Sequence, residues 1–285
     1  MADREGERPP IPEALPVPIV DAHTHLDACG AKTAADVVEM VDRAAAAGVG
    51  RVVTVADDLA AAQWAARAAT WDPRVFAAVA VHPTRTAAFT DADRGLVEEL
   101  GRRPRVVAIG ETGLDYYWDY SPPEAQHEAF RWHIDLAKRV GKPLMIHDRD
   151  AHEDIYRILL EEGPPEKVVF HCFSGDAEFA RRCVDHGWVL SLAGTVTFRN
   201  AKALRDALAV IPNCQLLVET DAPFLTPHPF RGRPNEPYCA AYTLRALAQF
   251  KGVSVETLGA EVAANAERVF DLPRTTDGEP GGRGA

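Results

Sequence analysis

Eight short runs of apolar, β-favouring residues recur along this chain, and longer stretches with helical spacing separate them. The runs are apolar almost throughout, without the regular polar alternation of a strand that has one face in water. Such strands are typical of a parallel sheet that helices cover on both faces. We expect strands at residues 17–25, 51–56, 75–82, 105–111, 143–147, 168–171, 188–193 and 215–221.

The stretches between these runs carry helix signals. Thr33 precedes an apolar-periodic run that closes at Gly48, where glycine suits the position after a helix. Ser121, with Glu124 three residues later, predicts a capping box for a helix that stops at Gly141. Further helices are expected at 58–70, 91–102, 149–162, 176–186, 200–210, 238–250 and 254–270. Eight β-α units in about 250 residues predict an α/β fold, a single (β/α)8 TIM barrel.

The barrel is expected to span residues 17–273 as one domain. Residues 1–16 and 274–285 carry Gly, Pro and charge without periodicity, which predicts two disordered tails. No apolar run approaches the roughly 18 residues that cross a bilayer, and the N-terminus has no export signal. Five cysteines without a CxxC motif favour reduced thiols. We therefore expect a cytoplasmic protein with no membrane partner, and no obligate protein partner is evident.

Residues with metal-binding side chains fall at the ends of the predicted strands, where a barrel of this type carries its catalytic groups. His23 and His25 end the first strand, and because a strand alternates faces they point the same way. Single candidates end the later strands: Glu111, His147, His171 and Asp221. One such histidine alone would more often be structural, but burying six polar groups together is costly unless they are compensated. A pair of metal ions is the simplest compensation.

The same residues lie in five spaced motifs. They are DAHTHLD at 21–27, GETGLDYY at 110–117, HDRDA at 147–151, HCFSG at 171–175 and ETDAPFLTP at 219–227. In this order they resemble the TatD family of metal-dependent hydrolases, which belongs to the amidohydrolase-type barrels, over roughly residues 19–270. The resemblance implies a (β/α)8 barrel with two divalent ions and a phosphodiesterase activity, often that of a 3′-5′ exonuclease on DNA.

The resemblance also implies roles for the six residues. It places one ion on His23, His25 and Asp221, a second on His147 and His171, and Glu111 between them. Two ions about 3.5 to 4 Å apart need a shared anionic ligand. Many relatives in the wider superfamily use a carboxylated lysine there, but no lysine stands at this strand end, so Glu111 must take that role. The metals would activate a water for attack, with Asp221 orienting or deprotonating it. Four imidazoles favour Zn²⁺ or Mn²⁺ by ligand preference, whereas the resemblance implies that Mg²⁺ suffices.

Several neighbouring residues are candidates for substrate contacts, each with a structural alternative. His82 either contacts a substrate phosphate or stabilises its own loop. Tyr116 or Tyr117 either stacks on a nucleobase or packs a lid onto the barrel. Arg231 and Arg233 either bind phosphates or belong to a rigid loop. Glu219 is expected to be a hydrogen-bond partner of a ligand imidazole.

Three further residues near these motifs are expected to have other positions. Asp115 follows Glu111 on a loop that would cover the site. Arg149, two residues after His147, is interpreted as a structural ion-pair partner. Cys172 is expected to face away from His171 and to pack behind the barrel.

The charge of the chain bears on the substrate. Its 31 basic and 42 acidic residues give a net charge of −11, the opposite of what a protein that wraps duplex DNA would show. A nucleic-acid substrate would have to be held locally, as a single-stranded or frayed DNA end taken into a metal pocket. The acidity leaves open a two-metal hydrolase of ester or amide bonds, such as a D-aminoacyl-tRNA deacylase-like enzyme or a small-molecule amidohydrolase. A non-catalytic metal-binding scaffold is a third alternative.

Overall fold

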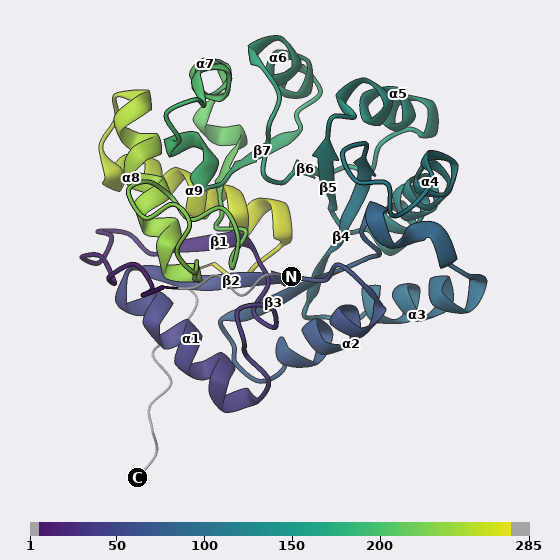
Figure 1. Ribbon diagram of the computed structural model, residues 1–285, viewed down its shortest axis with the longest axis horizontal. Helices are drawn as coiled ribbons and strands as arrows, with labels where there is room; N and C mark the ends of the chain where they lie inside the picture. Colours follow the sequence, from purple (N-terminus) through teal and green to yellow (C-terminus); the bar gives the residue numbers. More distant parts are fainter. Residues whose placement is uncertain (1–5, 275–285) are drawn as a thin grey trace.

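Eight parallel strands follow one another around a single sheet in the order of the sequence, with helices outside them (Figure 1). The structure is a computed structural model that describes residues 6–274. The strands are β1 (Ile19–Thr24), β2 (Val49–Val55), β3 (Val75–Val79), β4 (Val106–Asp115), β5 (Leu144–Arg149), β6 (Val168–Phe170), β7 (Val189–Leu192) and β8 (Leu216–Val218).

Backbone hydrogen bonds join the first strand to the segment that follows the last. The Asp221 N–H donates to the His23 carbonyl at 2.9 Å, and the His25 N–H donates to the Ala222 carbonyl at 2.8 Å. These bonds close the sheet on itself between β1 and the end of β8. The predicted (β/α)8 barrel is therefore confirmed.

Nine α-helices are described in residues 6–274, and each predicted helix is present within a few residues of its expected range. They are α1 (Ala34–Ala46), α2 (Leu59–Ala68), α3 (Asp91–Gly101), α4 (Pro123–Val140), α5 (His152–Glu162), α6 (Ala177–Asp185), α7 (Lys202–Val210), α8 (Ala240–Lys251) and α9 (Val255–Phe270). Short 3-10 turns lie at Pro83–Ala88, Gly194–Thr197, Asn213–Gln215 and Pro237–Cys239. No helix in this part of the chain is long and apolar enough to cross a membrane.

The capping box predicted at Ser121 is wrong. Helix α4 begins at Pro123 with Pro122 as its N-cap and no side-chain cap. The Ser121 hydroxyl instead accepts the N–H of Ala87 at 3.1 Å, which ties the start of α4 to the turn after β3. The predicted end is confirmed, since Gly141 adopts the left-handed conformation there.

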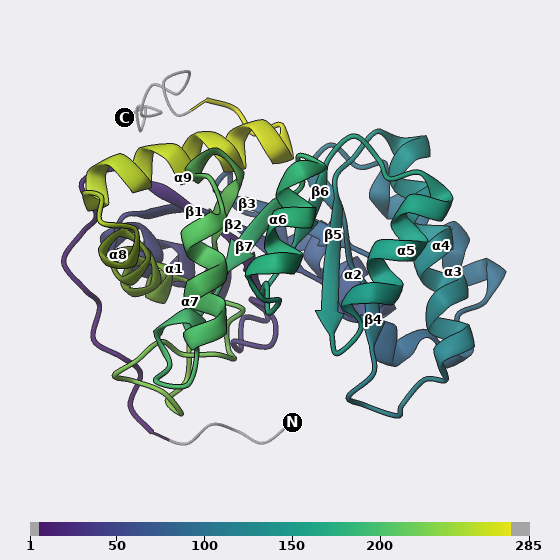
Figure 2. The ribbon, with the colours of Figure 1, turned by 90° about the horizontal axis from the view of Figure 1, so that it is seen from above.

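Two apolar layers build the core. The larger lies between the strands and the surrounding helices. The smaller joins strand residues such as Val53 and Val169 to Val269 and Phe270 near the C-terminal end of α9. Helix α9 lies across the barrel at the end opposite to the strand tips (Figure 2). One end of the barrel is thus filled by apolar side chains, and the other is left for polar groups.

Strand β4 continues four residues beyond the predicted end at Glu111. Gly110 and Gly113 permit this, because β4 and β5 approach so closely that a Cβ at either position would overlap Met145 or the His147 carbonyl. Gly113 also has φ 141°, a conformation that favours glycine. Asp115 is therefore the last residue of a strand, paired with Arg149 of β5, and not part of a covering loop.

The predicted N-terminal tail is held against the barrel over residues 6–16. The hydroxyls of Tyr238, in the 3-10 turn before α8, and Tyr242, in α8, donate to the carbonyls of Pro9 and Pro10 at 2.6 and 2.7 Å. Leu15 is buried in the core. Residues 1–5 and 275–285, which carry the rest of the two predicted tails, lie outside the described residues.

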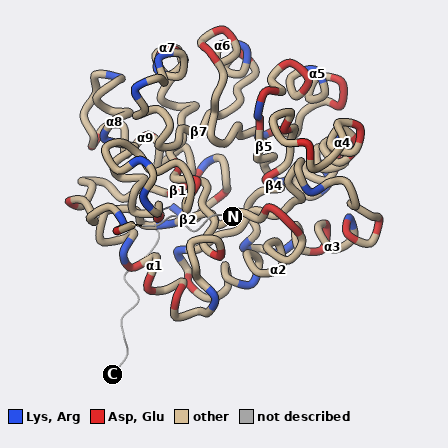
Figure 3. Tube along the Cα trace, in the orientation of Figure 1, with Lys and Arg blue, Asp and Glu red and all other residues tan. Residues whose placement is uncertain are grey.

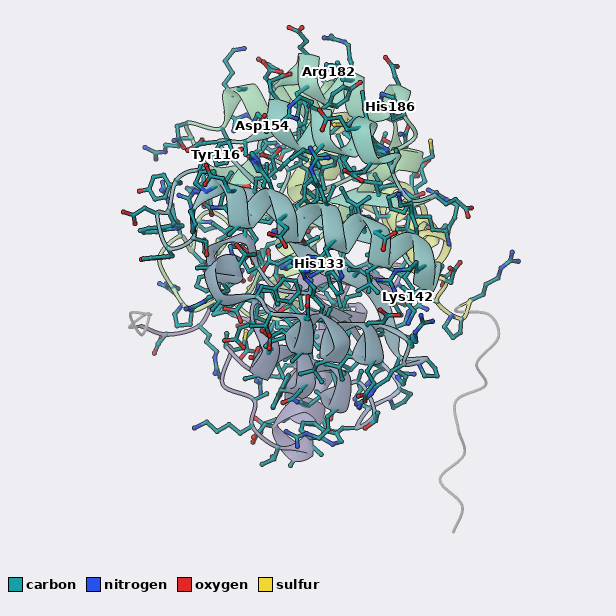
Figure 4. All side chains as sticks on the ribbon, turned by 90° about the vertical axis from the view of Figure 1, so that its right-hand side faces the viewer. Tyr116, His133, Lys142, Asp154, Arg182 and His186 are labelled. Carbon is teal, nitrogen blue, oxygen red and sulfur yellow. The ribbon has the colours of Figure 1, made fainter. Side chains whose placement is uncertain are left out.

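His133 of α4 is a buried histidine that holds the segment after β3 (labelled in Figure 4). Its Nδ1–H donates to the Ala129 carbonyl at 2.7 Å, and its Nε2 accepts the Val81 N–H at 3.3 Å. Burial lowers the pKa of His133 from 6.5 to about 3. The ring is therefore neutral in the folded protein at physiological pH, as its acceptor role requires.

We expect His133 to destabilise the fold in acid. Below about pH 6.5 His133 binds a proton in the unfolded chain, whereas in the folded chain it stays neutral until about pH 3. The free energy of unfolding therefore falls progressively as the pH drops between these values. The loss approaches roughly 4 kcal/mol near the lower limit. His133→Gln, measured by thermal unfolding in EDTA, should be less stable than the wild type at pH 7, and the difference should shrink by pH 4.5. A constant difference would contradict the assignment.

Candidate metal centre

Two histidines and one aspartate meet where β1 joins the end of β8. The Nε2 atoms of His23 and His25 are 3.3 Å apart, and Asp221 Oδ1 lies 3.8 and 3.4 Å from them. The Nδ1–H of His25 donates to the Val55 carbonyl at 2.9 Å, which turns its Nε2 toward the other two residues. Two imidazole nitrogens and one carboxylate oxygen thus converge on one point.

Glu111 lies between this group and a second one. Its Oε1 is 3.6 Å from His25 Nε2 and 3.8 Å from His23 Nε2. Its Oε2 is 2.8 Å from His171 Nε2 and 3.4 Å from His147 Nδ1. The two oxygens of one buried carboxylate therefore face two different donor groups.

The second group consists of His147 and His171, and each imidazole has a carboxylate behind it. His171 Nε2 and His147 Nδ1 are 3.4 Å apart. The far nitrogen of His147 lies 2.9 Å from Asp115 Oδ2, and that of His171 lies 3.3 Å from Glu219 Oε1. A carboxylate on the far nitrogen fixes the orientation of a metal-binding histidine, and Glu219 occupies the position predicted for it.

The arrangement fits divalent ions. Donors held about 2.1 Å from one ion in tetrahedral geometry lie roughly 3.4 Å apart, close to the separations in both groups. Three sets of donor atoms lie within 4.8 Å of one another: His23, Glu111 and His171; His23, His25 and Asp221; His82, Glu111 and His147. The donor chemistry, mixed imidazole and carboxylate, suits Zn²⁺ or Mn²⁺ and tolerates other divalent ions.

Without ions, the imidazoles themselves balance the buried carboxylate. Burial alone would raise the pKa of Glu111, but the charge on the neighbouring His171 holds that pKa well below its usual value. Burial would lower the pKa of His171, and the neighbouring Glu111 overrides it and raises the pKa well above normal. For His23, burial and the adjacent His171 both lower the pKa. Protons and divalent ions would therefore compete for this site.

His82 lies beside the centre. Its Nε2 is 4.0 Å from Glu111 Oε2, and its ring meets that of His147 edge to face at 4.3 Å. Its Nδ1 accepts the Thr84 N–H at 3.2 Å, which places the ring proton on Nε2, toward the centre. His82 thus makes a contact within its own loop, and its ring also lies beside the candidate metal centre.

The other three residues predicted to contact substrate lie farther out. Tyr116 points away from the barrel axis, with its hydroxyl donating to Asp154 of α5 at 2.6 Å (Figure 4). Arg231 and Arg233 are exposed on the loop after β8, where their guanidinium carbons lie 4.4 and 5.5 Å from the Phe198 and Phe230 rings. Hydrogen bonds and an ion pair hold the base of that loop.

Asn235 and Glu236 hold this loop. The Asn235 amide donates to the Thr220 carbonyl at 3.0 Å, and Glu236 pairs with Arg43 at 2.9 Å. Asp21 of β1 adds a second tie, since its carboxylate accepts the Thr220 N–H at 2.9 Å and the Thr220 hydroxyl at 2.6 Å. Sequence reasoning missed Asp21, although a carboxylate inside an apolar strand signals a buried partner.

Two of the neighbouring residues differ from expectation. Cys172 does not pack behind the barrel. It lies just after the end of β6 with φ 42°, and its N–H donates to Glu219 at 2.7 Å. Burial, with the charges of Asp221 and Glu219, raises the pKa of the Cys172 thiol well above its usual value. Arg149 makes no ion pair with the described residues; its guanidinium lies 4.0 Å from the centre of the Tyr117 ring.

Changing Asp115 to Asn should weaken ion binding about 10- to 100-fold at the His147 side, because the imidazole loses the charge that orients it. Titration with Mn²⁺ or Zn²⁺ under a competing chelator measures this. Glu99→Gln, which changes a carboxylate on the outer helix α3 instead, serves as the matched control. Equal affinities for the Asp115→Asn and Glu99→Gln variants would contradict the orienting role.

Comparison with known proteins agrees with this geometry. A family model described as TatD related DNase matches residues 20–271. A Mycobacterium tuberculosis protein named "Uncharacterized metal-dependent hydrolase TatD" is 59% identical over 259 residues, which cover 89% of this chain and 98% of that protein. The chain belongs to the TatD family. It is therefore a metal-dependent hydrolase of that family, as the sequence motifs predicted.

Other TatD-family relatives carry more specific names. A protein of Escherichia fergusonii named "3'-5' ssDNA/RNA exonuclease TatD" is 35% identical over 242 residues, which cover 82% of this chain and 92% of that protein. The solved structure of YJJV, a TatD homologue from Escherichia coli, superposes with a TM-score of 0.84 at 30% identity and covers 90% of this chain and 98% of its own. An organophosphorus hydrolase from Deinococcus radiodurans, 14% identical with a TM-score of 0.61, shares the fold alone.

Proposed function

We propose that this protein is a two-metal phosphodiesterase that removes nucleotides from the 3′ end of single-stranded nucleic acid. The observation that carries the proposal is the position of Glu111, whose Oε1 faces His25 at 3.6 Å and whose Oε2 faces His171 at 2.8 Å. A carboxylate shared in this way can hold two ions at the spacing that phosphodiester cleavage uses. The name of the Escherichia fergusonii relative supports the choice of substrate.

In this proposal the six predicted residues form two ligand sets around one bridge. His23, His25 and Asp221 hold one ion, His147 and His171 hold the other, and Glu111 binds both. Bound ions would supply Lewis acidity and offset the charge that develops on the phosphate. Glu219 and Asp115 keep the rings of His171 and His147 in the binding orientation.

Asp221 is proposed to take the proton of the attacking water. Its side chain is 14% exposed, against 5% for Glu111, so it is the carboxylate of the centre that water reaches more easily. Asp221 also has φ 51°, at a turn in the segment that follows β8. Proton transfer to a positioned carboxylate contributes about 10²- to 10⁴-fold to the rate of such reactions.

The substrate is proposed to be held by few, local contacts. Basic and acidic residues both occur on the outer helices (Figure 3). The Nε2–H of His82 can donate to a phosphate oxygen at the centre, and Arg231 and Arg233 can meet the strand at the rim. This arrangement suits a strand end better than a long duplex, in keeping with the net charge of −11.

The test is hydrolysis of a 5′-labelled single-stranded oligonucleotide by EDTA-treated protein to which Mg²⁺, Mn²⁺ or Zn²⁺ is returned. We expect a ladder of products shortened from the 3′ end only where metal is present. Parallel assays with 4-nitrophenyl acetate and a D-aminoacyl ester address the alternative. Turnover of either ester with no nucleotide release in any metal would reject the nuclease and support the ester hydrolase.

A further inference from the structure

Exposed aromatic residues are concentrated in one short segment, the connection from β4 to α4. Among the described residues, seven large hydrophobic side chains are exposed, and four of them fall within residues 116–120. Trp118 is 43% exposed and Tyr120 is 63% exposed. Clustered apolar exposure of this kind marks an interaction site more often than scattered single residues do. We call the rings of Tyr117, Trp118 and Tyr120 the aromatic platform.

The platform is built in advance of any ligand. Trp118 and Tyr120 lie parallel, with ring centres 5.4 Å apart and planes inclined by 8°, and Tyr117 meets Trp118 edge to face at 4.8 Å. Tyr116 anchors the segment on the outside, because its hydroxyl is held by Asp154 at 2.6 Å and lies 2.7 Å from His127 Nε2. Rings fixed in this way lose little conformational entropy on binding a flat partner.

One carboxylate links the platform to the candidate metal centre. Asp115 Oδ1 accepts the N–H groups of Tyr117 and Trp118, each at 3.0 Å. Its Oδ2 lies 2.9 Å from the Nε2 of His147, which in turn faces Glu111. The position of the aromatic rings is therefore set relative to the place where hydrolysis would occur.

Charge and topology add to this placement. The Arg149 guanidinium lies 4.0 Å from the Tyr117 ring centre, so a cation stands beside the platform. In the strand order β1 to β8, β4 is opposite β8, and the loops after these two strands flank the barrel mouth (Figures 1 and 2). A single-stranded nucleic acid whose 3′ end is at the candidate metal centre, with Arg231 and Arg233 on one side, would extend over the aromatic platform on the other.

We propose that the aromatic platform is a base-stacking subsite that binds unpaired nucleobases of the substrate next to the scissile nucleotide. The inference rests on the proposed nuclease function and adds a binding determinant to it. Two parallel rings extend a stack of bases at either outer face, without regard to sequence, and Arg149 can meet a backbone phosphate alongside. The subsite selects unpaired strands, because the bases of a duplex are already stacked on one another.

The experiment compares Trp118→Ala and Tyr120→Ala with Trp118→Phe, which keeps an aromatic ring. With a 12-nucleotide single strand we expect KM to rise about tenfold in the alanine variants, with kcat nearly unchanged, and to recover in Trp118→Phe. With bis(4-nitrophenyl) phosphate, which has no base, all variants should match the wild type. Phe250→Ala is the matched control, since that ring is 46% exposed on helix α8, outside the platform.

A second arm changes the substrate. An oligonucleotide that lacks bases next to its 3′ end should raise the KM of the wild type as much as Trp118→Ala does, and should raise that of the variant no further. An unchanged KM in both alanine variants would overturn the subsite. Equal losses of kcat/KM on the 12-nucleotide strand and on bis(4-nitrophenyl) phosphate would also overturn it. A changed sedimentation coefficient with unchanged KM would assign the rings to a protein contact and overturn it as well.

Binding separates this inference from the nuclease proposal. If the wild type cleaves no oligonucleotide, the nuclease proposal fails, and fluorescence anisotropy with a phosphorothioate strand and metal-loaded protein decides the subsite. Roughly tenfold weaker binding by Trp118→Ala than by Phe250→Ala would uphold it. Equal binding by these two variants would reject it.

Discussion

Replacement of Glu111 by Ala is expected to lower hydrolysis by at least about 10³-fold and to leave the protein with less than one bound ion per chain. Both proposed ions lose a ligand, and the repulsion between them is no longer offset. Because Glu111 lies between His25 and His171 at 3.6 and 2.8 Å, no other carboxylate of the described centre can take its place. Elemental analysis of the purified variant, beside steady-state rates, measures both effects.

The controls for this experiment separate charge from folding. Glu111→Gln keeps the shape of the side chain and should lose metal to nearly the same extent, since the amide supplies only one oxygen. Glu99→Ala, on the outer helix α3, should keep full occupancy and rate. If Glu111→Ala retained two ions per chain, Glu111 would not be the bridge.

Replacement of Asp221 by Asn is expected to lower kcat by about 10² to 10⁴-fold, because the variant loses the proposed proton acceptor. It should also weaken the ion held by His23 and His25, so rates are compared at saturating Mn²⁺. Elemental analysis distinguishes the two effects: loss of a base lowers kcat with both ions in place, whereas loss of a ligand alone lowers the metal content. An Asp221→Asn variant that holds two ions and keeps the wild-type kcat would rule out Asp221 as the base.

Much of the fold and centre followed from local patterns. Alternation along a strand is enough to place His23 and His25 together, and their Nε2 atoms are 3.3 Å apart. The carboxyl end of a parallel strand predicts at which end of the barrel Asp221 lies, although β4 continues past Glu111. Each of these inferences depends only on residues within one strand, so the sequence of that strand is enough to make it.

The remainder depends on contacts between distant segments. Asp115 was expected on a loop, because a run that contains Gly113 does not look like a strand until β5 pairs with it. The direction of Tyr116 depends on Asp154, which is on another helix. The segment 6–16 has no periodicity of its own, and tyrosines more than 200 positions away hold it in place.

The joint between β1 and the end of β8 is made by the residues that form the first donor group. The His23 carbonyl and the His25 N–H bond to Asp221 and Ala222, while the side chains of His23 and Asp221 face one another at 3.8 Å. An ion held by these side chains would link β1 to the segment after β8, where the barrel closes. Catalytic competence and the integrity of the closed sheet are thereby joined, so that a chain that failed to close would also be one that could not hold the ion.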